Sequence, residues 1–135
     1  MRDIILASKS PQRKNILKLI NLNFKIQKSN FNEKKVQINH ENPEKYCKYI
    51  AYKKTDYISK NYPESIVIGA DTIVYHKNKI LGKPKSKKEA SDYLKSLSNN
   101  QHYVYTAVSI KIDSIGLEKN IIDKTCVTFN NLKEE

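Results

Sequence analysis

Two short apolar runs stand out along the chain, and each is typical of a strand that is buried on both faces. The first run, Ile4 to Ala7, is followed by a turn rich in serine. The second, Ile66 to Ile68, is followed by the small residues Gly69 and Ala70 and then by the carboxylate of Asp71. Open α/β sheets place their ligands at strand ends. The pattern therefore predicts that Asp71 lies at the exit of a strand.

Three helices are predicted by apolar stripes at helical spacing and by the residues that precede them. Ser10 and Pro11 suit the start of a helix that runs to about Ile20, Asn42 and Pro43 open the second, and Ser86 begins a capping box for the third. The residues expected on the buried stripes are Ile16, Leu17 and Ile20 in the first helix, Tyr46, Cys47, Ile50, Ala51, Tyr57 and Ile58 in the second, and Ala90, Tyr93, Leu94 and Leu97 in the third.

The remaining pattern predicts strands joined by turns. The segments are a short strand from Phe24 to Gln27, a hairpin turn at Lys77-Asn78-Lys79, a strand from Tyr103 to Ile112, a turn from Asp113 to Gly116 and a return strand from Ile121 to Phe129. Alternation in the long strand places Val104, Thr106, Val108, Ile110 and Ile112 on one face.

The composition sets limits on the kind of protein. A chain of 135 residues suffices for a single domain, here residues 1–135, with a real core. No apolar run approaches the length of a membrane span, and no signal-peptide core follows the first residues. Cys47 and Cys126 lack metal-site spacing and are expected to be free, buried thiols. We therefore expect a cytoplasmic protein that does not contact a membrane.

The net charge of +11 raises the possibility of nucleic-acid binding. The 25 basic residues include only two arginines, Arg2 and Arg13, and the lysines are dispersed among asparagines along the whole chain. Nucleic-acid sites usually gather arginine and aromatic residues on one surface. The charge therefore indicates a general bias in residue usage, and nucleic acid is not the expected partner.

The turn after the first apolar run carries the groups of an anion site. Ser8 and Ser10 supply hydroxyls, Arg13 supplies a guanidinium, and the helix start supplies free backbone N–H groups. A cation in the first turn opposes the helix dipole, so a bound anion explains Arg13 better than helix stability does. The alternative is a plain capped helix with a solvated arginine.

Lys54 occupies one position of the apolar stripe of the second helix. A lysine in register with a core face either extends its ammonium to the edge of the core or reaches into a site for an anion. Spacing alone leaves both alternatives open. For Asp71 too, an ordinary surface aspartate after a core strand remains the alternative to a site residue.

Together these segments resemble the Maf family of nucleoside triphosphate pyrophosphatases. The matching segments are L-A-S-K-S-P-Q-R from Leu6 to Arg13, Glu33, Lys54, V-I-G-A-D-T from Val67 to Thr72, L-G-K-P from Leu81 to Pro84, T-A-V-S-I from Thr106 to Ile110 and D-K-T-C-V-T-F from Asp123 to Phe129. The resemblance implies an α/β fold with a mixed sheet and flanking helices, related to the inosine triphosphate pyrophosphatases. It also implies hydrolysis of a nucleoside triphosphate to a monophosphate and pyrophosphate, a Mg or Mn cofactor, and a homodimer.

The resemblance also implies roles for individual residues. Asp71 would be the general base that activates water, although a role as metal ligand is equally open. Glu33 would help to hold the metal, and the triphosphate would be held by Ser8, Arg13, Lys54 and Lys83. Thr72, in the A-D-T segment, resembles the subgroup that acts on dTTP and UTP. Gln12 stands where that subgroup has arginine, so the preferred base stays open.

Family members continue past the position of Glu135, so the resemblance implies that this sequence is the N-terminal portion of the family fold. Two alternatives to an active enzyme follow. One is a truncated, inactive relative that at most binds nucleotide. The other is a basic module that binds nucleic acid.

Overall fold

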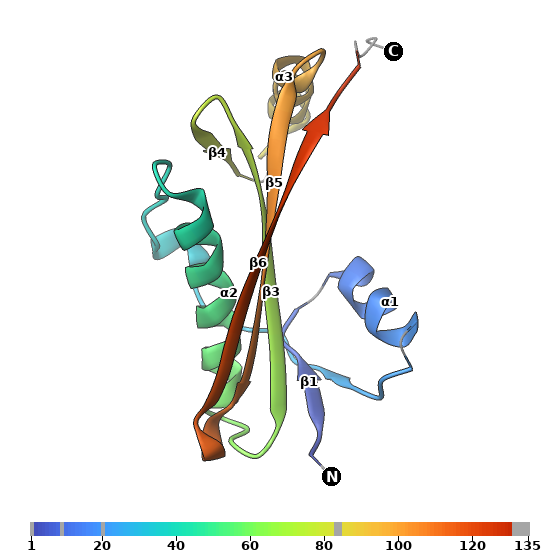
Figure 1. Cartoon of the computed structure of the whole chain (residues 1–135), viewed down its shortest axis with the longest axis vertical. Helices are drawn as coiled ribbons and strands as arrows, with labels where there is room; N and C mark the ends of the chain where they lie inside the picture. The colour runs from blue at the N-terminus through green and yellow to red at the C-terminus, as the bar shows by residue number, and fades with distance from the viewer. Residues whose placement is uncertain (1, 9, 20, 83–84, 131–135) are drawn as a thin grey trace.

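The computed structural model describes residues 2–8, 10–19, 21–82 and 85–130, in which three helices are interspersed with six strands (Figure 1). The strands are β1 (Ile4–Leu6), β2 (Lys25–Ile26), β3 (Ile66–His76), β4 (Lys79–Leu81), β5 (Gln101–Ile112) and β6 (Leu117–Thr128). The helices are α1 (Pro11–Leu19), α2 (Pro43–Ser59) and α3 (Lys87–Leu97), with 3-10 turns η1 (Glu33–Lys35) and η2 (Asp113–Ile115).

The strands form one mixed sheet in the order β2-β1-β3-β5-β6, with β4 paired to β3. β1 runs parallel to β2 and β3, whereas β3, β5 and β6 are antiparallel. α2 lies along one face of the long strands, and α1 lies on the opposite side (Figure 1). The expected α/β fold, a mixed sheet with flanking helices, is confirmed.

β3 is longer than the sequence pattern predicted, and this changes the place of Asp71. The strand continues through Gly69, Ala70 and Asp71 because β5 pairs with it throughout, with Asp71 opposite Ala107. The prediction that Asp71 lies at a strand's exit is therefore wrong. β1 ends at Leu6, opposite Ile68, so Asp71 lies on β3 just beyond the point where its parallel neighbour stops. The chain leaving β1 turns away there and opens space beside Asp71.

Among the described residues, α2 buries more side chains than α1 or α3, and it forms the core together with the sheet. Asn42 caps its start by accepting a hydrogen bond from the Lys45 backbone, and Pro43 occupies the first turn, as predicted. The buried residues Cys47 and Ala51 pack on Tyr105 and Ala107 of β5, and further along the helix Ile58 packs against β1 and β3. Tyr57, which was expected in this stripe, is 43% exposed because it lies at the stripe's edge.

The stripes predicted for α1 and α3 are largely wrong about burial. α1 buries none of its described residues, and Ile16 is 57% exposed. In α3 only Leu97 is buried, whereas Leu94 is 52% exposed. The physical reason is placement, since α1 stands away from the sheet and α3 lies near one end of it (Figure 1). Ile20 falls outside the described residues.

The hairpins follow the predicted turns, with longer strands. Lys77 and Asn78 both have positive φ, which is typical of a two-residue hairpin turn. Gly116 ends η2 with φ of 64°. β6 begins at Leu117 rather than Ile121, because its pairing with β5 extends to that turn. The face of β5 that α2 covers carries Tyr105, Ala107 and Ser109, so the alternating face from Val104 to Ile110 is the less buried one.

Both cysteines are free, as expected, but only Cys47 is buried. Cys126 is exposed because β6 is the outer strand of the sheet and α2 lies over the inner strands. The prediction of two buried thiols is therefore wrong for Cys126.

The contact between α2 and β3 depends on Gly69. A Cβ atom at this position would lie 2.0 Å from Oγ1 of the buried Thr55 and 3.2 Å from the Ala51 carbonyl oxygen. We expect Gly69→Ala to lower the free energy of unfolding by about 3 kcal/mol, because the helix has to move away from the sheet. Urea unfolding provides the measurement. Gly82→Ala is the matched control, since a Cβ there meets nothing within 4 Å. Equal stability of the two variants would contradict the prediction.

Asp56 of α2 and Lys111 of β5 form an ion pair within this interface, and Lys60 contacts the second Asp56 oxygen. Burial acts to raise the pKa of Asp56, but the hydrogen bonds from Lys111 and Lys60 outweigh it, so the pKa is lowered. The hydrogen bond to Asp56 raises the pKa of Lys111. The pair therefore stabilises the fold between about pH 4 and pH 10. This stabilisation is lost as the pH falls through the lowered pKa of Asp56 or rises through the raised pKa of Lys111.

We expect Asp56→Asn to lower the free energy of unfolding by about 3 kcal/mol at pH 7, because it leaves the Lys111 ammonium without its main partner. The difference from the unsubstituted chain should shrink as the pH falls from about 4 through the lowered pKa of Asp56, because the carboxylate then takes up a proton in the folded chain as well. Urea unfolding at pH 7 and pH 3 measures both values. Asp92→Asn on α3, an exposed position, is the control. A difference of the same size at both pH values would count against this account.

Candidate functional site

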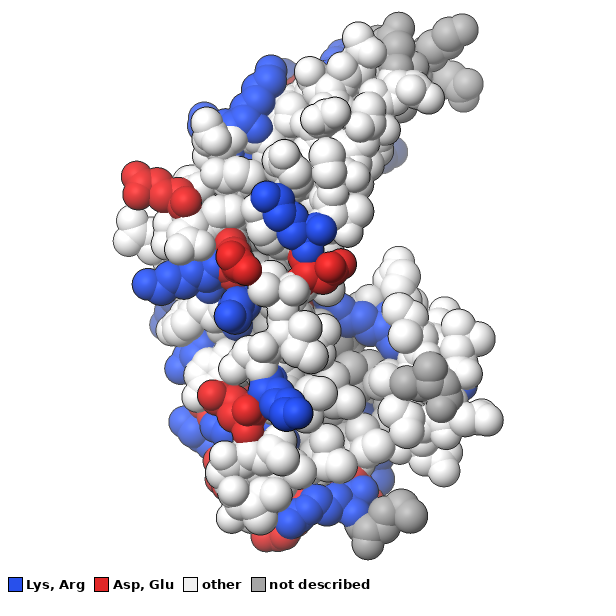
Figure 2. All heavy atoms as spheres, viewed as in Figure 1, with Lys and Arg blue, Asp and Glu red and all other residues white. Residues whose placement is uncertain are grey.

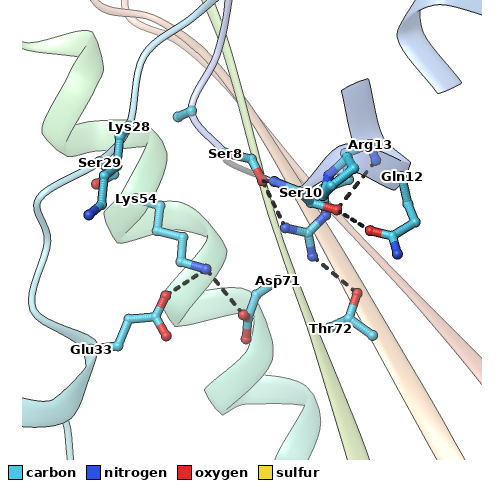
Figure 3. A pocket seen from close by; sticks show the side chains of 12 residues that line it. Ser8, Ser10, Gln12, Arg13, Lys28, Ser29, Glu33, Lys54, Asp71 and Thr72 are labelled. Atoms are coloured by element: carbon cyan, nitrogen blue, oxygen red, sulfur yellow. Dashed lines mark hydrogen bonds and ion pairs between the residues drawn. The ribbon is translucent and has the colours of Figure 1, made fainter. Parts of the chain in front are cut away.

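A cavity of about 550 Å³ opens beside Asp71, where the chain leaves β1. Its walls come from the β1–α1 turn and the first turn of α1, from η1 and the loop that leads to it, and from α2 and β3 (Figure 3). The lining residues are Ala7, Ser8, Ser10, Pro11, Gln12, Arg13, Lys28, Ser29, Glu33, Lys54, Asp71 and Thr72. The volume lies within the range typical of small-molecule sites.

Arg13 donates hydrogen bonds to two hydroxyl groups that line the cavity with it. Its Nη1 donates to Ser8 Oγ at 3.1 Å, and its Nη2 donates to Thr72 Oγ1 at 3.2 Å. Ser10 caps α1 by accepting from the Arg13 backbone N–H, and its hydroxyl donates to Gln12 Oε1. In the described part of the chain no carboxylate pairs with Arg13. The guanidinium is therefore a fixed positive group that can still receive an anion.

Lys54 lies between two carboxylates. Its Nζ is 2.6 Å from Glu33 Oε1 and 3.3 Å from Asp71 Oδ1 (Figure 3). The ammonium thus reaches into the cavity, which is the second of the two alternatives for this lysine, and its partners there are two carboxylates. That it binds an anion there stays a prediction. It forms ion pairs with side chains from the η1 turn and from β3.

Asp71 is held in a largely buried position, with its side chain 14% exposed. Burial raises the pKa of Asp71 above its ordinary value, Lys54 opposes that change, and Glu33 adds to it. A carboxylate with a raised pKa accepts a proton more readily near neutral pH. Its environment therefore suits a general base.

Cys47 supports the backbone at Asp71, a role that the sequence did not suggest. The thiol donates to the Asp71 carbonyl oxygen at 3.4 Å and lies 3.7 Å from the Tyr105 carbonyl oxygen. Burial raises the pKa of Cys47 to about 12, and the Asp71 carboxylate contributes to the increase. The group therefore remains a protonated donor at neutral pH.

The structure brings most of the predicted site residues into one cavity. Ser8, Gln12, Arg13, Glu33, Lys54, Asp71 and Thr72 all line it. Lys83 lies outside the described residues, so its role in holding the triphosphate stays a prediction. Lys28 and Ser29 were missed because they follow β2 in a polar segment without a recognisable motif.

The pair Glu33 and Asp71 fits a hard divalent cation. Carboxylate oxygens are the ligands that Mg²⁺ accepts, and such sites often use one or two carboxylates with the rest from water and phosphate. Among the described residues no group of three or more histidine, cysteine, aspartate or glutamate side chains is placed to hold a metal. Glu33 and Asp71 would therefore hold the cation together with ligands that come from outside the chain.

Comparison with known proteins places these residues in a family. The family model described as Maf-like protein matches residues 3–135. The chain is 43% identical over 136 residues to the dTTP/UTP pyrophosphatase of Geobacillus sp. (strain WCH70), covering 100% of this chain and 70% of that relative. The chain belongs to the Maf family.

Two further comparisons agree with this assignment. The dTTP/UTP pyrophosphatase of Thermosipho melanesiensis is 43% identical over 137 residues, which cover 98% of this Maf chain and 69% of the relative. The solved structure of the Staphylococcus aureus Ham1 protein superposes with a TM-score of 0.60 at 17% identity, covering 93% of this chain and 70% of that one. The second likeness concerns the fold alone.

The surface of this Maf chain shows no single basic stripe on the face seen in Figure 2. Lysine and arginine side chains are dispersed there, and acidic side chains lie between them. Among the described residues, no helix has both the length and the apolar character needed to cross a membrane. That nucleic acid is not a partner and that the chain forms a homodimer both stay predictions.

Proposed function

We propose that this chain hydrolyses nucleoside triphosphates to nucleoside monophosphates and pyrophosphate, with dTTP and UTP as the first substrates to test. The observation that carries the proposal is that two kinds of group line one cavity. Arg13, hydrogen bonded to Ser8 and Thr72, supplies positive charge, and Asp71 supplies a carboxylate (Figure 3). The names of the Geobacillus and Thermosipho relatives support the choice of substrate.

The site residues can divide the chemistry between them. Arg13, Ser8 and Thr72 bind and orient phosphate oxygens, because a guanidinium and hydroxyls donate hydrogen bonds to them. Asp71 takes a proton from water as the water oxygen bonds to a phosphorus of the α–β anhydride. The bond from that phosphorus to the bridging oxygen breaks, and the products are pyrophosphate and the monophosphate. One water is consumed.

A Mg²⁺ or Mn²⁺ cofactor is part of the proposal. When bound, it neutralises charge that develops on the phosphate oxygens. Glu33 and Asp71 would hold it. Asp71 can serve as the base, as a metal ligand, or as both, and Mn²⁺ binding by Asp71→Asn distinguishes these roles.

Pyrophosphate release by the purified chain tests this function. The assay uses dTTP, UTP, CTP and GTP, each with Mg²⁺, with Mn²⁺ and with excess chelator. We expect turnover that requires the divalent cation and is fastest with dTTP or UTP. A folded chain that releases no pyrophosphate from any of them would overturn the proposal and favour the inactive relative. We also propose that the protein acts in the cytoplasm, where such nucleotides are found.

A further inference from the structure

Of the three cations that line the described part of this cavity, Arg13 and Lys54 are engaged in different ways. The Arg13 guanidinium is hydrogen bonded to neutral hydroxyls, which leaves its charge uncompensated. The Lys54 ammonium lies within 3.3 Å of two carboxylates, so its charge is already matched. A phosphate that enters the cavity would therefore meet a ready guanidinium and an occupied lysine.

The Glu33 and Asp71 carboxylates, which form ion pairs with Lys54, are also the oxygen donors that fit a divalent cation. Glu33 comes from the η1 turn, Asp71 from β3 and Lys54 from α2, so three separate elements converge on one ammonium group. The Lys54 side chain is only 18% exposed, which leaves it little freedom to pair elsewhere while the carboxylates hold it. A divalent cation that binds the same oxygens has to compete with the ammonium directly.

Charge complementarity determines how this competition ends. Glu33 and Asp71 carry two negative charges and Lys54 carries one positive charge, so the trio is net negative without a metal. When a divalent cation takes the carboxylates, the ammonium next to it is repelled because like charges at this separation cost free energy. A phosphate bound at Arg13, which lines the same cavity, would then offer the ammonium a group of opposite charge.

We propose that Lys54 holds the Glu33 and Asp71 carboxylates together until a divalent cation displaces its ammonium, which then binds substrate phosphate. The inference rests on the proposed function, because it assigns the same carboxylates to the metal that turnover uses. Lys54 thus acts as a resident cation that competes with the metal, and it becomes a phosphate ligand only after the exchange. Because the bound cation frees the Lys54 ammonium to bind phosphate, metal binding and substrate binding are coupled.

The test measures Mn²⁺ binding by electron paramagnetic resonance, which reports unbound Mn²⁺, in the absence of nucleotide. It compares the unsubstituted chain with Lys54→Met and with Lys53→Met. Lys53→Met removes the same charge from the adjacent residue of α2, whose ammonium lies over the Phe31 and Tyr49 rings instead. We expect Lys54→Met to lower the Mn²⁺ dissociation constant by about tenfold or more, because the competing ammonium is gone. Lys53→Met should change it by less than about twofold, because the ammonium that it removes contacts two rings and not the carboxylates.

A dissociation constant for Lys54→Met that equals or exceeds that of the unsubstituted chain overturns the proposal. Lys54→Gln serves as a second variant if the methionine variant fails to fold, because it keeps a polar side chain and removes only the charge. We expect the same decrease in the Mn²⁺ dissociation constant for Lys54→Gln. Circular dichroism establishes that each variant is folded before its binding is compared.

The measurement requires no turnover, so it separates this inference from the proposed function. Tighter Mn²⁺ binding by Lys54→Met in a chain without pyrophosphatase activity would uphold the competition and reject the activity. Unchanged Mn²⁺ binding in a chain that hydrolyses dTTP would do the reverse.

Discussion

Asp71→Asn is expected to lower kcat for pyrophosphate release by about a thousandfold. Asparagine has nearly the same shape as aspartate, but its amide accepts no proton at neutral pH. It also cannot neutralise a cation as a carboxylate does. Either role proposed for Asp71 is therefore removed while the fold is kept, since the Lys54–Glu33 ion pair at 2.6 Å remains available.

The same assay needs a control and a second readout. Asp92→Asn on the exposed face of α3 removes an equal charge and should leave turnover unchanged. Mn²⁺ binding by Asp71→Asn then separates the two roles. Retained binding assigns Asp71 as the base, whereas lost binding assigns it as a metal ligand. Turnover within about tenfold of the unsubstituted chain would eliminate Asp71 from the chemistry altogether.

Arg13→Lys is expected to lower kcat/KM by about a hundredfold, although the charge is conserved. The guanidinium donates to Ser8 and Thr72 from two nitrogens at once, at 3.1 and 3.2 Å. A lysine ammonium is a point charge on a flexible chain and cannot span these two hydroxyls while it also contacts a phosphate. We therefore expect the substitution to impair the orientation of substrate as well as its binding.

Arg2→Lys is the matched control because Arg2 is the only other arginine in the chain. Its guanidinium pairs with Glu64 and does not line the cavity. Steady-state kinetics with dTTP should give the same kcat/KM for Arg2→Lys as for the unsubstituted chain. If both arginine variants lose activity equally, a general effect on folding explains the loss, and the role given to Arg13 is wrong.

The sequence identified most of the residues that line the cavity, because the patterns that mark them are local. The Ser10 cap and the Arg13 position are encoded within four residues, and the apolar run before Asp71 marks its strand directly. The structure confirms that these groups line one cavity. The part of β3 beyond Asp71 depends on pairing with β5, which lies later in the chain, and this pairing makes β3 longer than its own pattern indicates.

Contacts between distant elements account for the other errors. The apolar stripe on α1 indicates which side of the helix is apolar, but it does not predict whether another element packs on that side. Ile16 of this stripe is exposed. Lys54 was correctly singled out as unusual for its stripe. Its partners Glu33 and Asp71 come from other elements, so spacing along α2 had no means of identifying them.

The two cysteines differ in a way that has a practical use. Cys47 is enclosed between α2 and the sheet, and its thiol stays protonated because its pKa is raised to about 12. Cys126 is exposed on β6. Thiol reagents act on the thiolate of accessible cysteines. A maleimide dye therefore labels the outer strand of the native sheet at one position without any engineered substitution, and a second equivalent of reagent is consumed only when α2 separates from the sheet.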